Sequence, residues 1–416
     1  MRVVVTGRVS LATATSRGLI LDLIRSQGPI SRVELAALTG LTPASISNIV
    51  RTLLTDEIVL ESGRGESTGG KPRVLVEINP RARFAVGVQL DSGSITTVIV
   101  NSMGAIVARM KSPSLDATSP ELLVRAIARA HHALLEAIDL EPSRIVGVGI
   151  ASPGPLDLAR GAVLATTLGW GAATFPLAQA VQEAINLPVV LDNDASAAAI
   201  GDYWTGGIED PTAHCTIYLG AGIGAGILIN GAIYRGASSN AGEIGHTWVV
   251  DPTHPDGGGP LEEIAGPRGV VRAARFAIAR GAAASFTLSA ADTDPGADFA
   301  AIASAAVTGD PLALALVEAS ADAVSERVLA LADVLDSSSI ALAGPTLAIA
   351  GSIYLERVRA RVQREFFAGG VHRVSVTLSP HPADAAAIGG AALVLQAELS
   401  PRSAAGGAFR PVAASR

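Results

Sequence analysis

The chain has 416 residues, 49% hydrophobic and 17% charged, so it is long enough for two or three folded domains. Its single cysteine, Cys215, excludes an internal disulfide and any zinc site built from several cysteines. The apolar runs are short and interrupted, and the first residues lack a signal-peptide core, so we expect a cytoplasmic protein that does not contact the membrane.

The net charge of −7 is distributed unevenly along the chain. Residues 1–80 hold nine Lys and Arg against seven Asp and Glu, a net charge of +2, which leaves −9 for the remainder. A mildly basic head on an acidic body is typical of a DNA-binding module joined to an enzyme-like domain.

Three short helices are predicted near the start of the chain. The first covers residues 14–26 and ends before Gly28-Pro29. The second begins at the capping box Ser31-Arg-Val-Glu34 and ends at Gly40. The third has Thr42 as its N-cap and a proline in its first turn. Helix, glycine turn and capped helix together predict a helix-turn-helix.

The polar face of the third helix and the hairpin after it are suited to DNA. Strands are predicted at 58–61 and 73–78, on either side of a glycine-rich tip, which is typical of a wing. A generic helical domain with a solvated polar face is the alternative, but this complete order of elements is rarer, so DNA binding is favoured. The candidate DNA-contacting residues are Thr42, Ser45, Ser47, Asn48, Arg51, Arg64 and Lys71.

From residue 81 onward, strands alternate with helices. Two stretches each open with hairpin strands and continue with β-α units, which predicts a duplicated α/β fold with a cleft between two lobes. The predicted strands are 84–90, 94–100, 105–110, 144–150, 187–191, 216–219 and 223–229, with helices near 119–138 and 176–186.

Four polar or glycine-rich groups follow predicted strands, where α/β proteins bind ligands. Each group also has a purely structural explanation. The glycines of 220–226 could form a tight hairpin, and 192–194 could cap a helix. Residues 241–246 could hold a buried structural histidine, and the carboxylates of 261–263 could interact favourably with a helix dipole. Taken together, their amide, imidazole and carboxylate groups match the donors and acceptors of a polyhydroxylated ligand.

Several strings in the chain resemble the ROK family of repressors, open reading frames and kinases, over residues 14–398. They are Leu41–Val50, Gly147–Pro155, Leu168-Gly-Trp170, Asp192–Ala195, Gly222–Gly226 and Tyr234–His246. The resemblance implies the actin-like, two-lobed sugar-kinase fold. It implies a winged helix-turn-helix at 1–80, one lobe at 81–193 completed by a C-terminal helix at 384–398, and a second lobe at 194–383. Residues 400–416 are predicted to be a disordered tail.

By position, the resemblance implies a complete sugar site. The implied contacts are Asn193, Asp194, Glu243, His246 and Glu262, and Asp194 matches the catalytic base of the kinase members. The nucleotide side is degraded, because Gln89 replaces the acid near magnesium, Ala221 replaces a threonine, and Pro345 follows Gly344. Gly222 and Gly224 complete the degenerate nucleotide-binding set.

Many family members bind zinc through cysteines that this chain lacks, since its equivalent segment is residues 252–260. We therefore expect no metal and no cofactor, with His246 facing the sugar and His254 facing solvent.

The favoured function is a sugar-responsive transcription regulator, a repressor of carbohydrate metabolism genes, without useful kinase activity. It would bind operator DNA as a homodimer or homotetramer and take a sugar effector between the lobes. The alternative is an active ATP-dependent sugar kinase with a DNA-binding head, which would use Mg-ATP and Asp194; Gln89 argues against it. A constitutive DNA-binding protein gives no reason for the intact sugar set.

Overall fold

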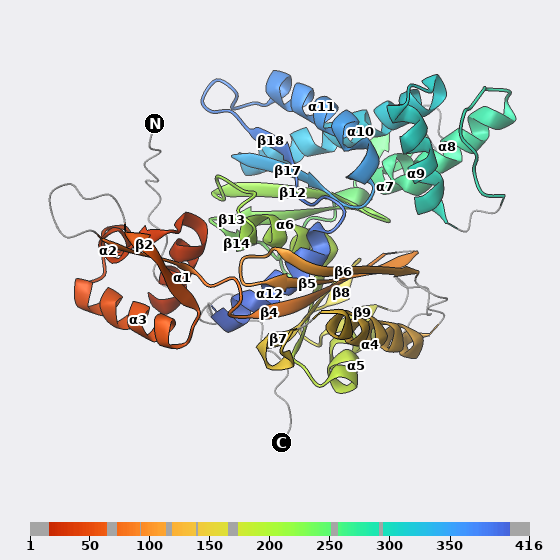
Figure 1. The fold of residues 1–416 in the computed structure, drawn as a ribbon. Helices are drawn as coiled ribbons and strands as arrows, with labels where there is room; N and C mark the ends of the chain where they lie inside the picture. Colours follow the sequence, from red (N-terminus) through yellow and green to blue (C-terminus); the bar gives the residue numbers. More distant parts are fainter. Residues whose placement is uncertain are drawn as a thin grey trace.

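The computed structural model describes residues 16–64, 73–91, 93–113, 119–138, 140–164, 174–250, 257–290 and 294–399. These residues form a small N-terminal head beside a body of two lobes (Figure 1). The predicted tail at 400–416, the string at 168–170 and His254 lie outside the described residues.

The head has the predicted helix-turn-helix order, followed by a hairpin. Both halves of the capping box are present, because the Ser31 hydroxyl accepts from the Glu34 N–H and the Glu34 carboxylate accepts from the Ser31 N–H. Gly40 ends the second helix at φ 69°. The two-residue strand Ile30–Ser31, which the sequence analysis missed, pairs with the last strand of the head. The elements are α1 (Ser16–Gln27), β1 (Ile30–Ser31), α2 (Arg32–Thr39), α3 (Pro43–Thr55), β2 (Val59–Arg64) and β3 (Val74–Ile78).

Lobe I is built on a sheet with the strand order β11-β7-β4-β5-β6. The first three strands of this lobe along the chain are antiparallel neighbours, and the next two add in parallel on the other side of β4. Its strands are β4 (Phe84–Leu90), β5 (Ser94–Asn101), β6 (Ile106–Pro113), β7 (Ile145–Ser152) and β11 (Val189–Asn193). The short strands β8 (Leu156–Asp157), β9 (Ala162–Leu164) and β10 (Thr174–Phe175) form a separate small sheet.

Lobe II repeats this arrangement in the order β14-β13-β12-β17-β18. Again three antiparallel strands are extended by two parallel ones, so the predicted duplication is confirmed. Its strands are β12 (Ala213–Leu219), β13 (Ile223–Ile229), β14 (Ala232–Ile233), β17 (Ser339–Ala343) and β18 (Ser375–Leu378). The strands β15 (Trp248–Val250) and β16 (Gly258–Pro260) pair with each other.

Helices cover the outer faces of both sheets, and one pair of helices lies between the sheets (Figure 1). The outer helices are α4 (Pro120–Ala137) and α5 (Leu177–Ile185) on lobe I, and α10 (Pro311–Leu335) and α11 (Leu347–Glu365) on lobe II. The central pair is α6 (Asp194–Trp204) and α12 (Ala385–Leu399). The remaining helices of lobe II are α7 (Leu261–Ala265), α8 (Pro267–Ala279) and α9 (Pro295–Val307).

The central pair packs closely because small residues line its contacts. A Cβ placed on Gly389 of α12 would lie 1.7 Å from the Ala197 carbonyl oxygen of α6. A Cβ on Gly226 of β13 would lie 2.1 Å from the Ala195 carbonyl oxygen. Backbone thus meets backbone on two sides of α6, which fixes that helix against both lobes. Since α6 packs between both sheets, the predicted lobe boundary at 193/194 stays a prediction.

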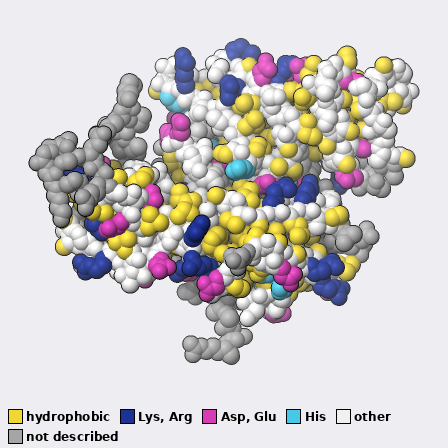
Figure 2. Space-filling view, viewed as in Figure 1, with side chains coloured by type: hydrophobic (Ala, Val, Ile, Leu, Met, Phe, Trp, Pro, Cys, Tyr) yellow, Lys and Arg dark blue, Asp and Glu magenta, His cyan; other side chains and the backbone are white. Residues whose placement is uncertain are grey.

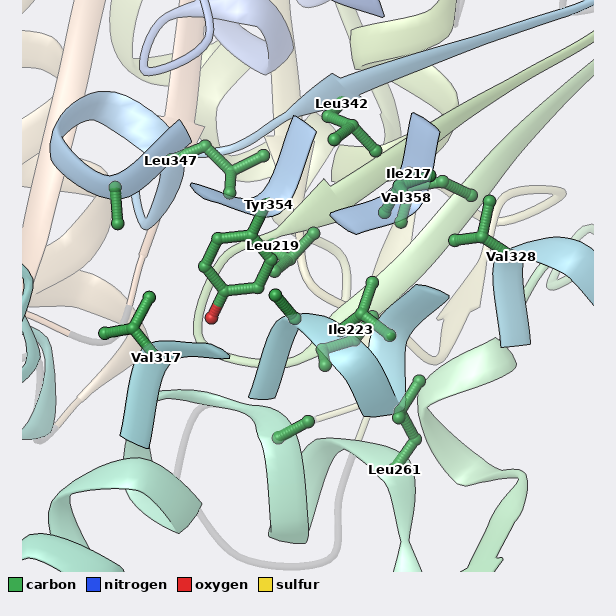
Figure 3. Close-up of a cluster of buried hydrophobic side chains, with 14 of the residues drawn as sticks. Ile217, Leu219, Ile223, Leu261, Val317, Val328, Leu342, Leu347, Tyr354 and Val358 are labelled. Carbon is green, nitrogen blue, oxygen red and sulfur yellow. The ribbon is translucent and has the colours of Figure 1, made fainter. Parts of the chain in front are cut away.

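The core of lobe II holds the start of α7 in place (Figure 3). Leu261 is fully buried in this core with Ile223 of β13. Tyr354 of α11 is also fully buried there, and its hydroxyl is 2.7 Å from the Ser320 hydroxyl. Because Leu261 is anchored, its neighbour Glu262 is held at the edge of β13.

On the face shown in Figure 2, basic and acidic side chains are interspersed over head and body. In the part of the chain that the structure describes, no single helix is long and apolar enough to cross a membrane. The pair α9 and α10 meets the length and composition criteria together but is bent by 110°.

Candidate functional site

Asn193 ends β11 and caps α6, so its side chain is fixed by the backbone. Its Oδ1 accepts from the N–H groups of Ala195 at 2.9 Å and Ser196 at 3.1 Å. The N-cap alternative is therefore correct for this oxygen. The amide Nδ2 of Asn193 and the Glu243 Oε1 both lie close to Gly154. A Cβ built onto this glycine would be 3.4 Å from the Nδ2 and 3.0 Å from the Oε1. The cap thus presents its amide nitrogen on the side where Glu243 lies.

Asp194, the first residue of α6, is surrounded by protein although part of its side chain stays accessible. Burial raises the pKa of Asp194 to about 8, and the charges of Glu243 and Asp91 act in the same direction. Its Oδ1 accepts from the Ala195 N–H at 2.8 Å. At neutral pH this carboxyl is largely protonated, so it can donate a hydrogen bond.

Glu243, His246 and Glu262 come from lobe II and lie near one another. Glu243 precedes a single turn of 3-10 helix, η2 (Ile244–His246). The His246 Nε2 is 3.9 Å from the Glu262 Oε1, and the His246 side chain is 68% exposed. Burial raises the pKa of Glu243, His246 lowers it, and Glu262 raises it again. All three groups therefore interact electrostatically.

Two glycines make room for the Glu262 carboxylate. A Cβ built onto Gly222 would lie 2.6 Å from the Glu262 Oε2, and a Cβ built onto Gly245 would lie 2.7 Å from the same oxygen. The same oxygen accepts from the Ile223 N–H at 3.3 Å. The structure thus brings together all five residues of the predicted sugar set, two from the end of β11 and start of α6 and three from lobe II.

The predicted nucleotide residues have packing roles within the protein. Gln89 is buried, and its Oε1 has no hydrogen-bond partner among the described residues. Gly224 faces α6, where an added Cβ would lie 3.1 Å from the Ala195 Cβ. Gly344, at φ +115°, lies against the Leu219 backbone. A role for these positions in binding a nucleotide stays a prediction, as does the absence of a metal. Within the described ranges, no group of three or more His, Cys, Asp or Glu is placed to hold one.

Sequence reasoning missed two contacts that join the lobes beside this site. Arg235 forms a bidentate ion pair with Asp192, which directly precedes Asn193. Asn240 exchanges two hydrogen bonds with the Leu156 backbone, at 2.9 and 3.1 Å. Arg235 and Asn240 both fall in the 234–246 string, and no local pattern pairs them with lobe I.

In the head, the exposed face of α3 carries the predicted DNA-contacting residues. Thr42 and Ser45 are exposed, with their hydroxyls 2.9 Å apart, and the Thr42 hydroxyl accepts from the Ser45 N–H. Asn48 and Arg51 are exposed and hydrogen-bonded at 3.3 Å. Ser47 is half-buried. Lys71 and the side chain of Arg64 lie outside the described residues.

A cavity of about 420 Å³ lies elsewhere, at the junction of the head and lobe I. It is lined by charged side chains, among them Glu57, Arg83 and Arg144, and shares no residue with the predicted sugar set. With Glu57, Glu141 and Glu398 against Arg83 and Arg144, its lining carries charges of both signs.

Comparison with known proteins assigns the body of the chain to a family. The model of the ROK family matches residues 85–397, from within the first strand of lobe I to within α12. The chain belongs to the ROK family.

Relatives of this ROK protein include regulators and kinases. A xylose repressor from Caldicellulosiruptor bescii is 27% identical over 398 residues, which cover 95% of this chain and 98% of the repressor. A glucokinase from Halalkalibacterium halodurans is 30% identical and covers 76% of this chain and 97% of the kinase. The crystal structure of a ROK family transcriptional regulator, a homolog of the Escherichia coli MLC protein, superposes with a TM-score of 0.72 at 23% identity, covering 92% of this chain and 96% of the regulator. The ROK protein thus shares its fold, head included, with a regulator.

Proposed function

We propose that this ROK protein is a transcription regulator whose affinity for operator DNA changes when a neutral monosaccharide binds between its lobes. The observation that carries the proposal is the gathering of five polar side chains from both lobes in a chain that also has a winged helix-turn-helix head. A ligand that contacts both sets is sensitive to how the lobes are placed.

The charges of the site favour a neutral ligand. Glu243 interacts with both Asp194 and Glu262, and the charge of Asp91 also acts on Asp194. A phosphate group would be repelled by these carboxylates, and the nearby Arg235 is already paired with Asp192. Sugar hydroxyls, in contrast, can donate to the carboxylates and accept from the Asn193 amide and a protonated Asp194. The effector is therefore an unphosphorylated sugar, and the full-length match to a xylose repressor supports D-xylose as the first choice.

The same geometry favours sensing over phosphoryl transfer. The raised pKa of Asp194, about 8, suits a hydrogen-bond donor to a sugar and a general base equally, so this residue does not separate the two functions. Gln89 supplies a neutral amide where an acid would help hold magnesium. Because a glucokinase is among the relatives, sugar phosphorylation is the alternative function that the experiments must exclude.

Thermal shift with D-xylose, D-glucose and D-glucose 6-phosphate tests the sugar site. We expect a neutral sugar to raise the unfolding temperature and the phosphate ester to have no effect. Glu262→Gln should weaken sugar binding at least about tenfold, since it weakens a charged hydrogen bond. Its exposed neighbour supplies the control, because Glu263→Gln should bind sugar like the wild type. Equal binding by both variants would refute the site.

Operator binding tests the regulatory claim. Duplex DNA selected from a random-sequence library by the wild-type protein serves as operator, and its affinity is measured with and without the sugar that stabilises the protein. We expect the sugar to change this affinity by at least fivefold, within the usual range of coupling. Operator affinity that no tested sugar alters would refute regulation, and ATP-dependent phosphorylation abolished by Asp194→Asn would favour the kinase.

A further inference from the structure

Helix α6 joins the two sites of the protein directly. It begins beside Asn193 and Asp194 of the predicted sugar set and ends at Trp204, against the head. Its 11 residues make a rod about 16 Å long, at 1.5 Å per residue. Backbone packing of α6 against α12 and β13 leaves little space for the rod to bend. A displacement at its first turn is therefore carried to its last.

The far end of α6 is held by an arginine of the head. Arg25, on α1, has a side chain that is only 4% exposed, and its Nη1 donates to the carbonyl oxygens of Trp204 at 2.6 Å and Tyr203 at 3.2 Å. These carbonyls belong to the last turn of α6, where the helix dipole favours a positive charge. The Arg25 guanidinium also lies 4.7 Å from the Trp204 ring and 5.1 Å from the Tyr203 ring.

A carboxylate completes this joint from the head side. Asp22, one turn before Arg25 on α1, pairs with the guanidinium at 2.7 Å. The Tyr203 hydroxyl donates to its other oxygen at 3.1 Å. Head and body therefore share a set of contacts, which we call the α1–α6 joint: Asp22, Arg25, Tyr203 and Trp204. The apolar cores are continuous here as well, since Ile24 of α1 and Trp204 belong to one buried cluster.

The residue just before the joint connects α6 to lobe II. Asp202 is buried and accepts from the Ser379 hydroxyl at 2.5 Å and the Thr216 hydroxyl at 3.3 Å. Three consecutive residues of α6 thus contact lobe II and the head. The Trp204 indole N–H also donates to the Ser102 carbonyl oxygen of lobe I at 3.3 Å. Both lobes and the head therefore meet at this end of α6, so a movement of lobe II against lobe I acts on the contacts of the head.

We propose that α6 transmits sugar binding to the DNA-binding head, and that Arg25 is the positioning residue that couples them. The inference rests on the proposed function and assigns its regulation to one element. Arg25 contacts neither the predicted sugar set nor the exposed face of α3. Its loss should therefore uncouple the two sites while each keeps its own ligand.

The experiment is a thermodynamic cycle on the full chain. The affinity for the selected operator is measured with and without D-xylose, or with D-glucose where D-xylose gives no thermal shift, in the wild type, Arg25→Met, Arg25→Lys and Tyr203→Phe. For the wild type we expect the operator affinities with and without sugar to differ by a ratio of at least fivefold. Arg25→Met should reduce it to within about twofold, and the other two variants should give intermediate ratios. Sugar affinity without DNA should stay within about threefold of the wild type. The same ratio should describe the effect of operator on sugar affinity, because coupling is reciprocal.

Arg280→Met is the control for the loss of an arginine elsewhere in the chain. Arg280 is the C-cap of α8, and its guanidinium lies 5.3 Å from the exposed Phe276 ring, so it is a surface arginine that contacts an aromatic ring away from the head. It should keep the wild-type ratio. Should Arg25→Met fail to fold, Tyr203→Phe and Arg25→Lys decide the question.

Two outcomes would overturn the inference, and they differ. A wild type that responds to sugar, with Arg25 and Tyr203 variants that respond equally, would overturn the role of α6 alone. A wild type that binds operator but responds to no sugar would overturn the proposed function and this inference with it.

Discussion

The guanidinium of Arg235 donates two hydrogen bonds to the carboxylate of Asp192, at 2.8 and 2.7 Å, and so ties lobe II to lobe I. Asp192 is fully buried, and the Arg235 side chain is 21% exposed. The Asn193 N–H donates to the same carboxylate at 2.9 Å. The pair therefore holds the segment that leads to Glu243 against the strand that ends in Asn193. It sets the spacing of the two halves of the predicted sugar site.

Removing Arg235 should be costly, because it leaves a buried carboxylate without its partner. We expect Arg235→Met to lower the free energy of unfolding by about 3–5 kcal/mol in urea titrations. Arg160→Met is the control, since Arg160 is 79% exposed and lies 3.6 Å from Asp157. That surface pair should contribute no more than about 1 kcal/mol. If both variants lose the same stability, the Asp192 pair does not hold the lobes.

Asp194→Asn should stabilise the sugar-free protein at neutral pH and above. The folded-state pKa of Asp194 is raised from 3.8 to about 8, chiefly by burial. Between these values the folded state binds the extra proton, so the contribution of Asp194 to stability is full below pH 4 and is lost as the pH rises to 8. The difference in unfolding temperature between Asp194→Asn and the wild type should therefore grow from pH 4 to 8.

Asp310 provides a control of opposite sign. Its pKa is lowered by hydrogen bonds from the Ala313 N–H and from Ser285. Asp310→Asn should therefore destabilise the protein at pH 7, and this difference should shrink as the pH falls below 4. A flat pH dependence of the Asp194→Asn difference would show that this carboxyl is not protonated in the folded protein.

Elements with a local cause were predictable from sequence. The strands Phe84–Leu90 and Ile223–Ile229 have the predicted bounds, because each is an apolar run flanked by glycine or polar residues. The capping box of Ser31 set the start of α2 for the same reason. The strand β1 was missed, since two residues have no periodicity. The alanine-rich helices α9 and α10 were not assigned, because they lack a strong contrast between faces.

The site was predictable in its members but not in its supports. Asn193 and Glu243 stand in strings whose residue types match a known family, so they could be named. The partner of Asp192 could not, because Arg235 is 43 positions away and the pairing depends on how the lobes pack. Arg25 reads as an ordinary basic residue in the last turn of an amphipathic helix. Its partners lie 178 and 179 positions away, on a helix that tertiary packing alone brings to it.

The contact between α6 and α12 should not tolerate a side chain at Gly389. Alanine would gain up to about 1 kcal/mol in helix propensity. Its Cβ, however, would lie 1.7 Å from the Ala197 carbonyl oxygen, so the helices must separate. We expect Gly389→Ala to lose about 1–3 kcal/mol of stability in urea, or more. At Gly370 an added Cβ meets nothing within 4 Å, so Gly370→Ala should stay within about 0.5 kcal/mol of the wild type. A stable Gly389→Ala protein would mean that the central helices are not closely packed.

Arg51 should contact operator phosphate from the exposed face of α3. Its side chain is exposed, and among the described residues it is hydrogen-bonded only to a neighbour on the same helix, so Arg51→Ala should leave stability unchanged. Because a phosphate contact releases counterions, the variant should bind all operator sequences more weakly, and the slope of log affinity against log salt should fall by about 1. Fluorescence anisotropy at several salt concentrations measures both quantities. Arg160→Ala, on lobe I, should keep the wild-type affinity and slope. An Arg51→Ala protein with an unchanged slope would exclude the phosphate contact, and unchanged affinity would exclude this face of α3 as the DNA-binding surface.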